Sequence, residues 1–327
     1  MGLLRLFKPA RRSAHHWAWG AFLFIFCPFA LPAVTATPAN ASVTPHRLTK
    51  GAPRKAIQAR LSKAADAGNY REIELSLAQG ANPNGLSRTE YEFPILLKAT
   101  LSGCADCVKL LIKSGARPGL RDRQGTPLIL TLAAIRPKQP NQEKIWQAIT
   151  VLIRHSKPSA INATDAAYFG DKRTALHEAA ARGDIELAKL LIASGASQLI
   201  ANRYGELPLH MAVEKGQKQL VSLLLDLGSP VTAKTRFTKA SSLTLAAESG
   251  HVEIVFLLIE RMKKTEPREA LKALLESCDT FGRTPAMAAA QGLKAKKLNH
   301  AVSSTLNGSQ GNRYTEIIEL LQKSGRA

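Results

Sequence analysis

Four pairs of glycines stand twelve residues apart in this 327-residue chain, and each pair brackets an apolar run. The pairs are Gly68/Gly80, Gly103/Gly115, Gly183/Gly195 and Gly216/Gly228. The enclosed segments can be laid over one another: 104–114 and 184–194 both contain Lys-Leu-Leu-Ile at the same place. Self-similarity at a fixed period is the signature of a repeat solenoid. Solenoids usually work as binding surfaces, so a catalytic pocket is not the first expectation.

The repeat unit reads as two short helices and a loop. Gly183, Gly216 and Gly250 follow one another at intervals of 33 and 34 residues, and a short Ala-rich stretch precedes each. The stretch before Gly183 begins with Thr174, a residue type that caps helices, and glycine commonly ends a helix in the left-handed conformation. The run 184–192 then places apolar residues at helical spacing. We therefore expect two antiparallel helices in each unit.

These units resemble the ankyrin repeat in their Thr-Pro-Leu-His-like opening, Ala-Ala, Gly, Leu-Leu pair and Gly-Ala. The best matches are 171–202 and 203–235. The resemblance implies an all-α ankyrin-repeat solenoid of about seven helix-turn-helix units with short finger loops, covering 61–327. It also implies protein–protein recognition without catalysis, and therefore no catalytic residue, cofactor or metal.

Three units depart from the regular pattern. The third has a Pro/Lys/Gln-rich insertion at 136–143, so its second helix is expected late, at 145–155. The sixth is followed by an extra helical piece at 267–276. The seventh is interrupted by a Lys/Gly/Ser-rich insertion at 293–312, whose composition is typical of a loop.

Residues 1–36 differ in character from the rest of the chain. Four basic residues come first: Arg5, Lys8, Arg11 and Arg12. The apolar run 17–33 follows, and 34–36 fits a small-residue cleavage signal. This pattern predicts a secretory signal peptide, with an uncleaved inner-membrane anchor as the alternative, although the run is short for a span. We expect an exported bacterial protein, periplasmic or secreted, with 37–60 as a flexible linker.

The chain is basic, with a net charge of +20 from 45 basic and 25 acidic residues. Residues 1–65 hold ten Lys and Arg and no acid. A basic chain invites a nucleic-acid hypothesis, but the sequence has no zinc-finger spacing, no aromatic RNA-binding signature and no long basic helix. We expect a monomer whose partner is another protein with an acidic surface, and we expect no nucleic acid to bind. Contact with a membrane is expected only through the leader, if the leader is not cleaved.

Aromatic and basic residues recur together in the loops between units, where the resemblance places projecting fingers. Exposed aromatic and Arg side chains are favoured at the centres of interfaces. The alternative is that the rings pack on the adjacent finger while the charges stay solvated. The candidate partner-binding residues are Lys172, Arg173, Arg203, Tyr204, Arg236, Phe237, Phe281 and Arg283.

Cys104 and Cys107 form a C-x-x-C at the start of a second repeat helix. In the repeat register Cys107 takes the place of Leu187, a core position. Three interpretations of the pair remain open: two small core residues, a disulfide or a redox pair. A helix N-terminus lowers a thiol pKa, but two cysteines alone do not make a zinc site. His177 and His210 also share one repeat position, and the resemblance implies a structural, hydrogen-bonding role for them.

No phosphate loop, dinucleotide-binding fingerprint or nucleophile elbow appears in the sequence. The first functional hypothesis is therefore a non-catalytic protein-interaction scaffold exported across the inner membrane. The second is a secreted effector that binds a host protein. The third is an accessory subunit that supports a redox enzyme in the envelope and uses Cys104 and Cys107.

Overall fold

The structure is a computed structural model that describes residues 54–86, 93–135, 142–165, 170–301 and 309–326. All of them belong to one compact unit, 51–327. The expected leader at 1–36 and the first part of the expected linker lie outside the described residues. The remaining linker residues, 54–60, form the first turns of helix α2. Their Arg, Lys, Ala and Gln side chains are good helix formers.

The described residues form 16 helices, of which fourteen make seven successive pairs. The pairs are α2 (Arg54–Ala67) with α3 (Tyr70–Ala78), α4 (Ile95–Leu101) with α5 (Ala105–Lys113), α6 (Leu128–Ile135) with α7 (Gln142–Arg154), α9 (Ala175–Arg182) with α10 (Ile185–Ala193), α11 (Pro208–Glu214) with α12 (Lys218–Asp226), α13 (Ser242–Ser249) with α14 (Val252–Thr265), and α16 (Pro285–Ala301) with α17 (Ser309–Arg326). Two single helices complete the set, α8 (Pro158–Ile161) and α15 (Arg268–Glu276).

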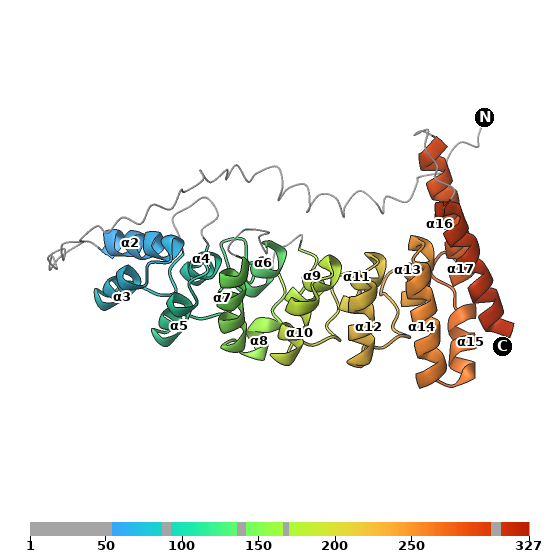
Figure 1. Cartoon of the computed structure of the whole chain (residues 1–327), viewed down its shortest axis with the longest axis horizontal. Helices are drawn as coiled ribbons and strands as arrows, with labels where there is room; N and C mark the ends of the chain where they lie inside the picture. The colour runs from blue at the N-terminus through green and yellow to red at the C-terminus, as the bar shows by residue number, and fades with distance from the viewer. Residues whose placement is uncertain (1–53, 87–92, 136–141, 166–169, 302–308, 327) are drawn as a thin grey trace, which may run out of the picture. The chain divides into compact units, whose positions relative to one another are not determined.

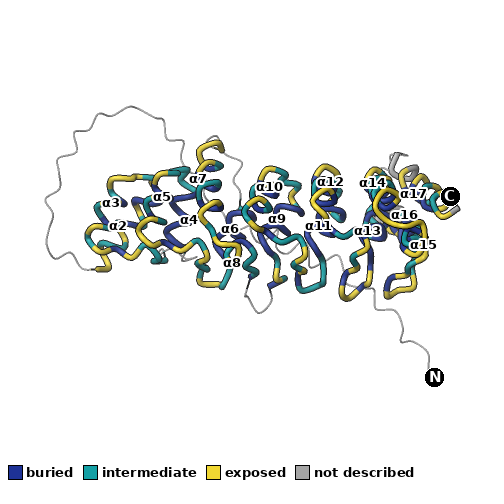
Figure 2. Tube along the Cα trace, turned by 90° about the horizontal axis from the view of Figure 1, so that it is seen from below, coloured by how far each residue is buried: buried dark blue, intermediate teal, exposed yellow. Residues whose placement is uncertain are grey.

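The pairs stack side by side in chain order (Figure 1). The first helices of successive units pack on one another from α6 through α9, α11 and α13 to α16, and α5 packs on α7. One hydrophobic cluster runs from Leu61 in α2 to Leu321 in α17. Figure 2 shows its buried residues along the facing sides of the helices. The units thus share one core, because a single helix pair cannot bury its own apolar face.

Local sequence explains where the helices begin and end. Pro208 occupies the first turn of α11, where no backbone N–H is required. Asp184 caps α10 by accepting a hydrogen bond from the backbone N–H of Leu187. The paired glycines close the helices: Gly183 ends α9 with φ 71° and Gly195 follows α10 with φ 97°. The glycine spacing is therefore the length of one capped second helix.

The C-terminal units are longer than the sequence pattern suggests. Met262 stands where a glycine would end α14; it is fully buried, and α14 continues to Thr265. The segment 293–312, expected as a loop, is helical wherever the structure describes it, at 293–301 and 309–312. The stretch 293–301 combines Ala, Leu and Lys, whose helix propensity outweighs the loop-like overall composition of the insertion.

The last helix pair closes the end of the stack. Tyr314 in α17 is 2% exposed, and its hydroxyl donates a 3.3 Å hydrogen bond to the Glu248 carbonyl at the end of α13. Ile317 and Leu321 from the same helix join the common core. The helix α17 therefore covers apolar surface that the last inner helices would otherwise expose.

Candidate functional site

The loops between units are ordered fingers built on a recurring turn. The Asn202 Oδ1 atom accepts hydrogen bonds from the backbone N–H groups of Tyr204 and Glu206, both at 2.9 Å. Asp122 and Asp279 accept equivalent pairs of backbone hydrogen bonds in their own fingers. Asx turns of this kind satisfy backbone donors that the short loop would otherwise leave unpaired. The fingers are thus fixed in shape before any partner arrives.

Neighbouring fingers are joined by their backbones. In each case a backbone N–H from one finger donates to a carbonyl of the preceding finger at 2.7–2.9 Å. The bonds run from Arg203 to Asp171, from Arg236 to Tyr204 and from Thr280 to Thr238. Side chains from four successive units are therefore held at fixed intervals along one edge of the stack.

Arg173, one of the sequence-predicted residues, is engaged within the molecule. Its guanidinium is 17% exposed and pairs with Asp171 at 3.2 Å and Glu178 at 3.1 Å. Burial would lower the pKa of Arg173, but these two carboxylates raise it above the usual value. The side chain fastens its finger to α9, so little of it is left for a partner.

Arg283 lies in the same way in the last finger. It is 13% exposed and forms ion pairs with Glu248 at 3.0 Å and Asp279 at 2.6 Å. Burial alone would raise the pKa of Asp279, but the hydrogen bonds from Arg283 hold it below the usual value. The guanidinium carbon of Arg283 also lies 5.1 Å from the centre of the Phe281 ring, a cation–π contact that helps to orient this ring.

The other predicted residues lie along the finger edge. Phe237 and Phe281 are each 57% exposed, which is unusual for large apolar side chains. Tyr204 and Phe237 meet edge to face with ring centres 6.4 Å apart, and the Arg236 guanidinium carbon lies 5.9 Å from the Phe237 ring. These contacts orient the rings without covering them. The Tyr204 and Phe237 rings thus pack between neighbouring fingers, as the alternative expects, while Phe237 and Phe281 keep exposed surface; binding through them stays a prediction.

Sequence reasoning did not single out Lys239, which is exposed in the same finger as Phe237. Its φ of 53° marks a turn position, a signal that the residue type alone does not carry. With this addition the edge is defined as the finger row: Lys172, Arg203, Tyr204, Arg236, Phe237, Lys239 and Phe281.

The finger row is positively charged for a structural reason. Four of its seven members are Lys or Arg, and none is acidic. The acids of the same fingers are engaged elsewhere, since Asp171 pairs with Arg173 and the side chain of Asp279 is fully buried against Arg283. The Glu206 carboxylate accepts a hydrogen bond from Asn202. The exposed row therefore combines cations with aromatic rings, the chemistry that recognises acidic and aromatic groups.

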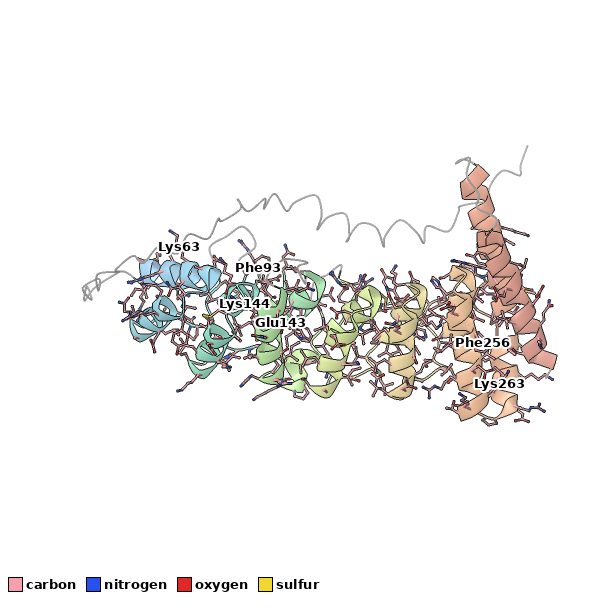
Figure 3. All side chains as sticks on the ribbon, viewed as in Figure 1. Lys63, Phe93, Glu143, Lys144, Phe256 and Lys263 are labelled. Carbon is pink, nitrogen blue, oxygen red and sulfur yellow. A yellow bond between two sulfur atoms is a disulfide. The ribbon has the colours of Figure 1, made fainter. Side chains whose placement is uncertain are left out.

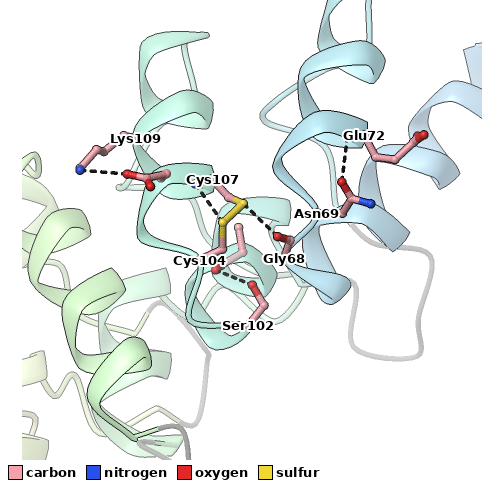
Figure 4. Close-up of a disulfide and its surroundings, with 9 residues drawn as sticks. Gly68, Asn69, Glu72, Ser102, Cys104, Cys107 and Lys109 are labelled. Carbon is pink, nitrogen blue, oxygen red and sulfur yellow. Dashed lines mark hydrogen bonds and ion pairs between the residues drawn. A yellow bond between two sulfur atoms is a disulfide. The ribbon is translucent and has the colours of Figure 1, made fainter. Parts of the chain in front are cut away.

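The structure joins Cys104 and Cys107 by a disulfide at the N-terminus of α5 (Figure 4). Cys107 is fully buried in the common core, as its repeat register predicts, and Cys104 is half-buried. The pair lies at the end of α4 opposite the finger that precedes this helix, so it is not part of the finger row. Among the described residues, no group of three or more His, Cys, Asp and Glu side chains could hold a metal ion.

His177 and His210 make the same hydrogen bonds in successive units. The Nδ1 atom of His177 accepts from the Thr174 backbone N–H at 3.1 Å, and its Nε2 donates to the Glu206 carbonyl at 3.0 Å. His210 repeats this arrangement with Leu207 and Ala233. Each ring thus links the start of its helix to the finger that follows, which is the structural role expected from the sequence.

These hydrogen bonds make stability depend on pH. Burial, helped by the charges of Arg173 and His210, lowers the pKa of His177 to about 4. The pKa of His177 is therefore higher in the unfolded chain than in the folded one. Its contribution to the free energy of unfolding is fully present above pH 6.5 and is lost as the pH falls from 6.5 to 4. We expect a loss of about 2 kcal/mol between pH 7 and pH 5 from this residue. Urea unfolding at both pH values measures it, and His177→Gln should reduce the difference.

No helix among the described residues is long and apolar enough to cross a membrane. The expected leader is not among these residues, so this observation concerns only the helical stack.

Comparisons with known proteins agree with this architecture. Residues 132–235 match the family described as ankyrin repeats in three copies. The ankyrin repeat domain of Bcl-3, a member of the IkappaB family, superposes with a TM-score of 0.57 at 24% identity over 70% of this chain and 93% of that one. The human ASB11 ankyrin repeat domain superposes with a TM-score of 0.52 at 21% identity. The match covers 72% of this chain and 96% of that one.

Curated relatives match over short parts of their own length. The p105 subunit of NF-kappa-B from Gallus gallus is 30% identical over 51% of this chain and 16% of the relative. The Caenorhabditis elegans protein mask-1, which has ankyrin repeats and a KH domain, is 29% identical. The match covers 58% of this chain and 7% of the relative. The chain thus spans a small part of the length of these relatives. Its described part is an all-helical ankyrin-repeat domain, a fold whose repeats generally bind other proteins.

Proposed function

We propose that this chain is a non-catalytic protein-interaction module that binds a partner protein through the finger row. The observation that carries the proposal is the row of rings and cations fixed across successive fingers. Five of its members are exposed and two, Arg203 and Tyr204, are half-buried. Backbone hydrogen bonds between fingers hold it in place, so little conformational entropy is lost on binding. Arg173 and Arg283, which are engaged within the molecule, are left out of the proposed contact set.

The chemistry of the row selects the partner. Phe237 and Phe281 offer apolar surface, while Arg236 and Lys239 add positive charge beside the first ring. Oppositely charged surfaces speed association and exclude wrong partners. We therefore propose a protein segment that carries both carboxylates and apolar side chains as the bound element.

The location proposed for this activity is outside the cytoplasm, in the periplasm or the medium of a bacterial cell. Its support is the sequence of 1–36, in which a basic start precedes the apolar run 17–33. A secreted effector with a host target uses the same leader and the same finger row, so the two differ only in the partner. Identifying the partner separates them.

Site-directed photo-crosslinking tests where the partner binds. A photoreactive phenylalanine at Phe237 should give a covalent adduct in the native cell, because this ring is exposed in the finger row. The matched control is Phe256 on α14 (Figure 3), which is 53% exposed against 57% for Phe237. Mass spectrometry of the adduct names the partner.

The comparison between the two positions decides the proposal. An adduct from Phe237 and none from Phe256 supports binding through the fingers. An adduct formed at Phe256 alone, or equally at both positions, would show that the partner uses the outer helices or that capture is non-specific.

A further inference from the structure

Cys104 occupies a position that carries an oxygen side chain in other units. Asn69 and Asp184, at the same place after the unit's glycine, cap α3 and α10 by accepting a backbone hydrogen bond from the third residue on. In α5 the acceptor is the Cys104 sulfur, 3.2 Å from the backbone nitrogen of Cys107. A neutral sulfur is a weak acceptor, whereas a thiolate there would gain from the backbone donor and the helix dipole.

Burial distinguishes the two sulfurs. Cys107 is fully buried, and its sulfur lies 3.5 Å from the Gly68 carbonyl oxygen of the preceding unit. Cys104 is half-buried at the turn itself. Figure 4 shows the pair between the first turn of α5 and the Gly68 turn. A reagent from solution therefore reacts with the Cys104 sulfur first. The buried Cys107 sulfur is placed to react only with Cys104.

A purely structural purpose explains this disulfide poorly. The two cysteines are three residues apart. Cross-linking residues so close in sequence removes little entropy from the unfolded chain, and the helix already fixes their spacing. Asn69 and Asp184 show that a unit of this protein caps its second helix without sulfur.

We propose that Cys104 and Cys107 form a thiol–disulfide exchange site whose co-reactant is a protein dithiol or disulfide. In the reduced protein the Cys104 thiolate attacks a partner disulfide, one partner sulfur leaves as a thiolate, and a mixed disulfide forms. The Cys107 thiolate then attacks Cys104, closes the internal disulfide and releases the second partner thiol. Two electrons pass from the cysteine pair to the partner, and the reverse sequence oxidises a partner dithiol.

The proposal is tested on the full chain by alkylation at a series of pH values. In Cys107→Ser, Cys104 should react with an apparent pKa about one unit or more below that of Cys278, because thiols at helix N-termini are acidified. Cys278 is an exposed free thiol in the same molecule and serves as the internal reference. Peptide mapping should also find a mixed disulfide with glutathione at Cys104 in Cys107→Ser and none at the buried Cys107 in Cys104→Ser, while the exposed Cys278 can form one in either variant.

A second measurement does not depend on those variants. The wild-type protein, equilibrated in glutathione buffers and quenched with acid, should interconvert between a dithiol and a disulfide confined to Cys104 and Cys107 while its helical signal stays constant. Cys104→Asp, which gives α5 the same type of cap that Asp184 provides for α10, should fold and lose the exchange. Reduction only after unfolding, or a Cys104 that titrates like Cys278, would overturn the proposal. Crosslinking at Phe237 should be unaffected, which separates this test from that of the binding surface.

Discussion

Replacing Leu224 with alanine is expected to lower the free energy of unfolding by about 3 kcal/mol, within the range for buried leucines. Leu224 is fully buried in α12, in the core that connects neighbouring units. Truncation leaves a cavity that the packed helices cannot fill. Because repeat stability depends on coupling between neighbours, the unfolding transition should also broaden as the two halves of the stack separate.

The matched control is Leu227→Ala, one turn further along the chain. Leu227 is 45% exposed at the end of the same helix, so its truncation should change stability by less than about 0.5 kcal/mol. Urea unfolding followed by circular dichroism measures both variants. Equal effects of the two substitutions would contradict a continuous core through α12.

The regular part of this fold could be predicted from the sequence because the signals are local. A glycine after each helix, an oxygen cap such as Asp184 and an apolar stripe act within one unit, and they recur at a fixed spacing. Repetition then strengthens each weak signal. The helix pairs follow from this pattern, and the structural role of His177 and His210 follows from the family resemblance that the pattern carries.

The irregular part could not be predicted from composition, because the overall Gly and Ser content of 293–312 hides a stretch of high helix propensity. The segment 293–312 contains Gly and Ser beside a good helix-forming stretch, and α16 and α17 extend into it from both sides. Helices that already pack on a core extend at little cost, since propagation needs no new nucleus. A break in the repeat therefore indicated longer helices rather than a loop.

The role of Arg283 depends in part on a partner far away in sequence. Arg283 pairs with Asp279, four residues earlier, and with Glu248, 35 residues earlier, whereas Arg236 has no acid nearby in sequence and stays exposed. Only the stacking of units brings the Glu248 carboxylate to the finger. Sequence reasoning could thus locate the fingers but could not separate their internal ion pairs from their exposed cations.

Reversing two charges in the finger row is expected to weaken partner binding by more than about tenfold. Arg236 and Lys239 are both exposed in one finger, and glutamate at both positions would repel an acidic segment that the wild-type row attracts. Arg236→Glu also removes the cation beside the Phe237 ring. The fold should be unaffected, because the backbone hydrogen bonds of this finger remain.

The control must change the net charge equally at another place. Lys109→Glu with Lys189→Glu does so on the outer helices α5 and α10, where both lysines are more than half exposed and pair only with a nearby acid of their own helix. Exposed pairs of this kind contribute little to stability. Any loss of binding common to both double variants reports overall charge, and any difference reports the finger row.

The most direct test of the account is the affinity of the crosslinked partner for the wild type and these two double variants, measured at low and physiological salt. Binding through the finger row predicts a loss of more than about tenfold for Arg236→Glu/Lys239→Glu, larger at low salt, and a loss of less than about threefold for Lys109→Glu/Lys189→Glu. Equal losses in both variants, or unchanged binding in the finger variant, would contradict it.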